Sequence, residues 1–116
     1  MTRRLTPESS LKATIADGLA ARYGLRFYRL NSGATSHVEP NGRVRYVRFS
    51  FEGCPDGFVL LPNGRTLWIE LKSPEGSLRP AQIIFRDACR LSRIPWVAPR
   101  SWEELDAYLR ELGVRR

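Results

Sequence analysis

An Asn-Gly pair, Asn63-Gly64, stands between two short apolar segments, residues 58–61 and 66–72. Both residue types tolerate the left-handed backbone that a tight β-turn requires. The pair therefore predicts an antiparallel hairpin with its turn at residues 62–65. The fold must contain these two paired strands, which excludes an all-helical structure.

Charged residues stand at the open end of this predicted hairpin. Asp56 follows Pro55 at the head of the first strand, and Glu70-Leu71-Lys72 ends the second. Because side chains alternate along a strand, Glu70 and Lys72 point to one face and Leu71 points to the core. Asp56 and Glu70 lie at similar distances from the turn, so we expect the two carboxylates to be near neighbours.

Two neighbouring carboxylates repel each other unless a cation lies between them. A hard divalent ion such as Mg²⁺, which takes carboxylate and carbonyl oxygens, water and substrate phosphate, removes that cost. Lys72 is then a candidate to orient an attacking water or to stabilise charge on the phosphorus. In the alternative interpretation, Glu70 and Lys72 form an ordinary salt bridge at an exposed strand end.

The flanking segments predict a mixed α/β fold. Thr6 and Gly24 are typical of the two ends of a helix over residues 7–24. A short strand is expected at 25–30, a polar loop at 31–42 and an extended segment at 43–51.

The C-terminal part of the chain predicts two more helices and a strand. Pro80 opens a helix, residues 94–98 form a strand whose Pro95 suits a sheet edge, and Ser101 with Glu104 makes a capping box. The order is one helix, about three strands, a helix, a strand and a last helix.

The charge distribution favours a phosphate-rich partner. Nineteen basic and 12 acidic residues give a net charge of +7, the pI is near 10.2, and 17 of the basic residues are arginine. Arginine binds phosphate through two parallel hydrogen bonds, although an arginine-favouring genome is an alternative explanation. Residues from 101 onward are net −1, so the C-terminal segment is not expected to bind nucleic acid. Candidate phosphate contacts, which could equally be a solvated face, are Asn31, Ser32, Arg43, Arg45, Arg48 and Arg79.

The length predicts a single domain over residues 1–116. A chain of this size folds without disulfides, so Cys54 and Cys89 are expected to be reduced thiols. There is no secretory signal and no apolar stretch long enough for a membrane helix, so we expect a cytoplasmic location, in a bacterial or phage-infected cell.

The set of motifs resembles a known nuclease superfamily. Glu8 in a first helix, Gly53-Cys54-Pro55-Asp56, Glu70-Leu71-Lys72 and Gln82 in a later helix form a pattern similar to the PD-(D/E)XK superfamily, and within it to the VRR-Nuc domain of stand-alone phage and bacterial proteins. The likeness runs from residue 6 to about 112. It implies a restriction-endonuclease-like αβββαβ core with an additional C-terminal helix. It also implies Mg²⁺- or Mn²⁺-dependent hydrolysis of DNA by a homodimer that acts on branched DNA such as four-way junctions.

The resemblance also assigns roles to individual residues. Asp56, Glu70 and the main-chain carbonyl of Leu71 would bind the metal, and Lys72 would be the catalytic lysine. The remaining motif residues would be a metal-side acid, Glu8, and a glutamine near the site, Gln82. Without the resemblance, Glu8 is a first-turn acid that complements the helix dipole, and Gln82 is a solvated residue early in a helix.

Two other functions remain open from the sequence. A basic nucleic-acid-binding module of the same fold without catalytic activity is the first alternative, because a fold alone does not confer function. A protein-interaction domain that uses an apolar strand edge is the second. The intact set of Asp56, Glu70 and Lys72 favours the nuclease.

Overall fold

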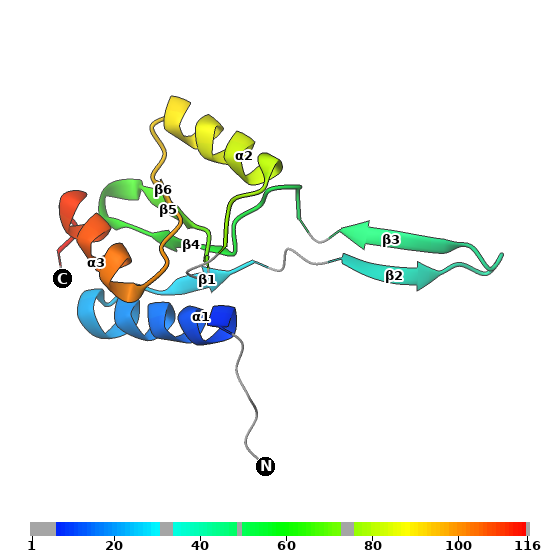
Figure 1. Ribbon diagram of the computed structural model, residues 1–116, viewed down its shortest axis with the longest axis horizontal. Coiled ribbons are helices and arrows are strands. Elements are labelled where there is room, and N and C mark those ends of the chain that lie inside the picture. Colours follow the sequence, from blue (N-terminus) through cyan, green and yellow to red (C-terminus); the bar gives the residue numbers. More distant parts are fainter. Residues whose placement is uncertain (1–6, 31–33, 49, 73–75, 116) are drawn as a thin grey trace, which may run out of the picture.

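The predicted hairpin forms the centre of a four-stranded sheet (Figure 1). The computed structural model describes residues 7–30, 34–48, 50–72 and 76–115, with the backbone alone at residues 7, 8, 34, 35 and 46–48. Strands β4 (Gly57–Leu60) and β5 (Thr66–Ile69) pair antiparallel. On the outer sides, β1 (Phe27–Arg29) is antiparallel to β4 and β6 (Trp96–Val97) is parallel to β5, which gives the order β1-β4-β5-β6.

The turn between β4 and β5 has the backbone that its sequence predicts. Asn63 and Gly64, within the short 3-10 turn η2 (Pro62–Gly64), have φ angles of 67° and 73°. The Leu61 N–H donates to the Arg65 carbonyl at 2.8 Å and closes the turn. Two successive left-handed residues suit the twist of a tight hairpin, so this turn fixes the strand register.

Helices cover both faces of the sheet (Figure 1). Helix α1 (Pro7–Gly18), its π-helical continuation η1 (Leu19–Tyr23) and helix α3 (Trp102–Glu111) pack on one face, and α2 (Pro80–Leu91) lies on the other. The main core lies under α1 and α3 and includes Ile15, Leu19, Val59, Leu67, Ile69, Leu105 and Leu109, all 0% exposed. This mixed sheet with three α-helices confirms the predicted fold class.

A row of aromatic residues crosses the face under α2. Tyr28 pairs with Phe58, Phe58 with Trp68, and Trp68 with Trp96, so one aromatic side chain comes from each strand. Phe85 of α2 contacts Trp68 edge-on, with ring centroids 5.3 Å apart. This contact anchors α2 over the hairpin and sets where the first turn of α2 lies.

The structure differs from the sequence prediction in the segment after β1. Part of the expected polar loop forms β2 (Ala34–Val38), which pairs antiparallel with β3 (Val44–Arg48) in a separate two-stranded sheet. The prediction of a loop was wrong because Ser36, His37 and Val38 are all exposed, so no apolar alternation in the sequence marks the strand. Backbone pairing with β3 defines it instead.

Cys54 and Cys89 are free thiols, as expected, and both are buried. In the part of the chain that the structure describes, no helix has both the length and the apolar character to cross a membrane.

Gly18 provides a test of how α1 packs on α3. A Cβ at this position would lie 2.5 Å from the Trp102 ring. Gly→Ala inside a helix normally stabilises a protein, but here we expect Gly18→Ala to destabilise it by about 1–3 kcal/mol and lower Tm by several degrees. Thermal unfolding measures the change. Adding Trp102→Leu should restore part of the loss, and a Tm equal to or above that of the wild type would contradict this packing.

Candidate active site

The register of β4 and β5 brings the predicted acids together. Gly57 pairs with Ile69, so Asp56 and Glu70 are opposite each other one residue further along. An Asp56 carboxylate oxygen, Oδ2, accepts a hydrogen bond from the Leu71 N–H at 2.7 Å, which holds the carboxylate across the strand end. Leu71 itself is buried in the core, as predicted, and Lys72 is half-buried.

The chain beyond β5 stays aligned with the segment beyond β6. The Glu70 N–H donates to the Val97 carbonyl at 2.9 Å, and the Lys72 N–H donates to the Pro99 carbonyl at 3.4 Å. Glu70 and Lys72 are thus positioned by sheet pairing, although the regular strand ends at Ile69.

These residues line a cavity of about 680 Å³. Its walls come from the end of the hairpin, the segment before β4 and the first turn of α2. The lining residues are Ser50, Phe51, Glu52, Gly53, Cys54, Asp56, Glu70, Leu71, Lys72, Arg79, Pro80, Ala81 and Gln82.

A glycine allows two of these walls to meet. Gly53 has φ +83°, and a Cβ there would lie 2.3 Å from the Ala81 carbonyl oxygen. Only glycine satisfies both the left-handed backbone and this close approach. Gly53 therefore fixes the segment before β4 against the first turn of α2.

Gln82 holds the first turn of α2, which forms one wall of the cavity, in place. Its side chain is 4% exposed, and its Oε1 accepts a hydrogen bond from the Arg79 N–H at 2.8 Å. Gln82 therefore satisfies a backbone donor that precedes the helix and fixes the start of α2. Gln82 lines the cavity and is not the solvated residue of the alternative interpretation.

Glu70 is the most perturbed ionisable group in the cavity. It is 5% exposed, and its Oε2 has no hydrogen-bond partner among the described residues. Burial, followed by the neighbouring Asp56 carboxylate, raises the pKa of Glu70 to about 8, and the charges of Lys72 and Arg79 offset part of this rise. Burial also raises the pKa of the Cys54 thiol, which makes this cysteine a poor nucleophile.

This donor set fits a magnesium or manganese ion. The buried Glu70 Oε2 has no hydrogen-bond partner among the described residues, and it lies beside the Asp56 carboxylate, which the Leu71 N–H holds in place. A divalent cation between them would offset the cost of burying a charged carboxylate and the repulsion between the two carboxylates. Among the described residues, no group of three or more His, Cys, Asp or Glu side chains is placed so that it could hold a metal ion. Mg²⁺ needs only one or two carboxylates when waters and substrate phosphate complete its shell.

The structure does not bring every predicted site residue to the cavity. Asp56, Glu70, Leu71, Lys72, Arg79 and Gln82 line it, whereas Arg43 and Arg45 lie on the β2–β3 hairpin. The Glu8 and Arg48 side chains, and Asn31 and Ser32 entirely, lie outside what the structure describes.

The sequence reasoning missed the wall formed by residues 50–53. Ser50, Phe51 and Glu52 carry no motif, and they line the cavity from the segment between β3 and β4. Gly53 next to Cys54-Pro55 was the available signal, since glycine before a rigid dipeptide indicates a constrained approach.

Replacing Glu70 by glutamine should stabilise the metal-free protein by about 1–2 kcal/mol at pH 7. With a pKa of about 8 in the folded state, Glu70 must take up a proton on folding at pH 7, and that uptake lowers the stability of the fold. The amide keeps the side-chain shape and needs no proton to be buried beside Asp56. Thermal unfolding in EDTA measures the change, with Glu103→Gln on exposed α3 as the matched control. A Tm below that of the wild type would contradict the conclusion that burying Glu70 beside Asp56 costs stability.

The chain shares its fold with a solved structure described as "VRR_NUC domain". The similarity has a TM-score of 0.63 and covers 92% of this chain and 97% of that chain at 21% sequence identity. Neither the known family models nor the curated proteins match the sequence. The likeness confirms, at the level of fold, the resemblance to VRR-Nuc domains and their restriction-endonuclease-like core.

Proposed function

We propose that this chain is a metal-dependent nuclease that hydrolyses phosphodiester bonds in DNA. The observation that carries the proposal is the pair of carboxylates, Asp56 and Glu70, at a cavity that also holds Lys72. The structural similarity to a VRR_NUC domain supports the same conclusion, because the name of that domain denotes a nuclease.

Each residue at the cavity has a specific part in this proposal. Asp56, Glu70 and the Leu71 carbonyl hold Mg²⁺ or Mn²⁺, which when bound polarises the phosphoryl group and lowers the pKa of a coordinated water. The Lys72 ammonium orients the attacking water or stabilises the negative charge that develops on the phosphoryl oxygens. Arg79 contacts a neighbouring phosphate, and Gln82 holds the Arg79 backbone in place.

The charge of the chain supports a nucleic acid as the substrate. The net charge of +7 attracts the phosphate backbone, and Arg79 and Lys72 place two cations at the cavity itself. A small anionic substrate would not need the arginines that lie outside the cavity.

For the substrate structure and assembly, we propose branched DNA and a homodimer, as the resemblance to stand-alone VRR-Nuc proteins implies. Symmetric cleavage of a four-way junction requires two cuts, and a two-fold dimer supplies two sites. The β6 edge at Pro95 and Trp96, or helix α3, is the proposed contact surface. A monomer by light scattering that still cleaves junctions fully would contradict the dimer.

Metal binding is the first test of the proposed function. Mg²⁺ or Mn²⁺ at about 100 times its Kd should stabilise the fold by about 2.7 kcal/mol, because the ion binds the folded chain only. The shift should disappear in Asp56→Asn and persist in Glu103→Gln. Equal shifts in all three proteins would place the ion elsewhere, and no shift in the wild type would contradict the metal site.

A further inference from the structure

The β2–β3 hairpin projects from the body of the protein as a separate arm (Figure 1). Its strands hydrogen-bond to each other and, as far as the described residues show, join no other sheet. Near its tip, Val38 is 65% exposed and Val44 is 56% exposed. An isolated two-stranded hairpin is only marginally stable in water, so such an arm is expected to gain stability from a partner.

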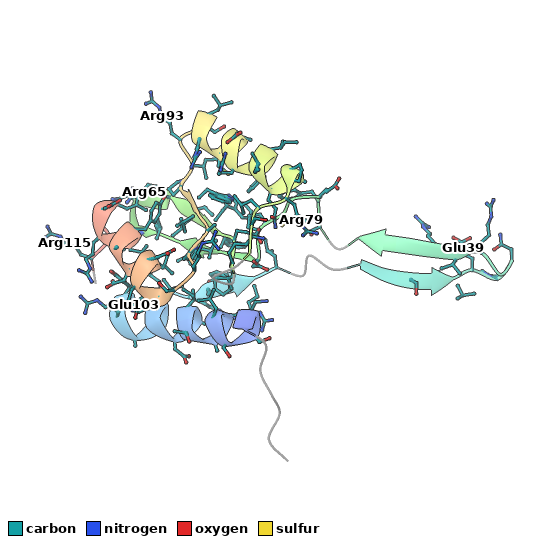
Figure 2. The ribbon with its side chains drawn as sticks, in the orientation of Figure 1. Glu39, Arg65, Arg79, Arg93, Glu103 and Arg115 are labelled. Atoms are coloured by element: carbon teal, nitrogen blue, oxygen red, sulfur yellow. The ribbon has the colours of Figure 1, made fainter. Side chains whose placement is uncertain are left out.

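The arm begins at the edge of the candidate active site. Residues 50–54, which follow β3 after one residue, line the cavity. In Figure 2, Arg79 lies on the side of the body from which the arm leaves, whereas Glu39 lies near the arm's tip. A molecule that occupies the cavity and extends beyond it in this direction meets the arm.

The two faces of the arm differ in chemistry. His37 pairs with Arg45, and Arg43, two residues before Arg45, shares that face. Glu39 is the one acid of the hairpin, 4.0 Å from Arg45, so the charged face remains net positive. Val38 pairs with Val44 on the opposite face and forms a small apolar surface.

We propose that the β2–β3 hairpin is a DNA-binding arm that lies in a groove of the duplex beside the scissile phosphate. This inference rests on the proposed nuclease function and adds how the substrate is held. The major groove admits a two-stranded β-ribbon, in which Arg43 and Arg45 contact phosphates and the Val38–Val44 pair contacts base edges.

The charge favours DNA over a second copy of the chain as the occupant. The arm carries exposed arginines on a protein whose net charge is +7, so docking it on an identical chain brings like charges together. A DNA phosphate backbone is complementary to the same residues.

The test compares two double variants in the Glu70→Gln background, which prevents cleavage while binding is measured. Arg43→Gln with Arg45→Gln removes two charges from the arm. Arg90→Gln with Arg115→Gln removes two exposed charges elsewhere, and Figure 2 shows Arg115 at the end of the molecule opposite the arm. Affinity for a duplex and hydroxyl-radical footprints are measured for both, and Tm verifies that both are folded.

The arm variant should bind about thirtyfold more weakly at 0.15 M salt, with a salt slope reduced by about two, because each phosphate contact adds ~0.9 to that slope. Its footprint should shrink on one side of the cleavage position only. The control variant should keep the full footprint.

Equal footprints and affinities for the two variants would overturn the proposal that the β2–β3 hairpin binds DNA. A change in oligomeric state by light scattering, with the footprint intact, would overturn it in favour of a second copy. Failure of the nuclease proposal gives a different result. The wild type would then protect DNA with a footprint that depends on Arg43 and Arg45, but it would not cleave the DNA. A wild type that binds no DNA overturns both.

Discussion

We expect Asp56→Asn to lower the rate of DNA cleavage by about a thousandfold or more and to leave the fold intact. The substitution removes one of the two carboxylates proposed to hold the divalent ion, and such an ion would stabilise the transition state by several kcal/mol. The asparagine Oδ1 still accepts a hydrogen bond from the Leu71 N–H, so the strand end keeps its 2.7 Å contact. Single-turnover cleavage of end-labelled DNA measures the loss.

DNA affinity is the control for this variant. Binding is spread over many arginines, so Asp56→Asn should bind DNA as tightly as the wild type, or slightly more tightly because a negative charge is removed. Cleavage near the wild-type rate would show that Asp56 is not a metal ligand. Loss of binding together with cleavage would point to a folding defect, which Tm identifies.

We expect Lys72→Ala to lower the rate of DNA cleavage by about a hundredfold or more while metal binding persists. The lysine lies beside Glu70 and lowers the pKa of that carboxyl. In the proposed function its ammonium would donate to water or phosphate and would not be a ligand of the ion. Calorimetry with Mn²⁺ should therefore detect binding by the variant, whereas cleavage should fall by about a hundredfold or more.

The sequence offers a matched control for Lys72. Lys12, the only other lysine, lies on α1 and does not line the cavity. Lys12→Ala should cleave at the wild-type rate. If metal affinity and activity disappear together in Lys72→Ala, Lys72 has a structural role. The assignment of metal binding to Asp56 and Glu70 and of catalysis to Lys72 would then be wrong.

The fold was predictable where local signals and burial agree. The Asn63-Gly64 turn fixes the register, and the capping residue Ser101 accepts a hydrogen bond from the Glu104 N–H at 3.2 Å, as the motif predicts. Strand β2 was not predictable, because it forms by pairing with β3, and the side chains that the structure describes on these strands, at residues 36–38, 44 and 45, are exposed. The π-helical turn at residues 19–23 also has no local signal, since packing of Leu19 and Tyr23 into the core determines it.

The site was predictable only in part. Counting residues from the turn along each strand places Asp56 opposite Glu70, and the alternation of side chains along a strand places Leu71 in the core. The burial of Glu70 and the contact of Gln82 with the Arg79 backbone depend on how α2 crosses the hairpin. That crossing is a tertiary property, set by Phe85 on Trp68 and by the approach of Gly53 to Ala81.

The most direct test is cleavage by the purified chain, in excess over labelled single-stranded, duplex, flap and four-way DNA, with Mg²⁺ or with EDTA. Wild type and Glu70→Gln are compared in the same experiment. A nuclease with its metal at Asp56 and Glu70 cleaves with Mg²⁺, fastest on the four-way junction, does nothing in EDTA, and loses activity in the more stable Glu70→Gln variant. Cleavage that persists in EDTA or in Glu70→Gln, or no cleavage of any substrate by the wild type, would contradict the assignment.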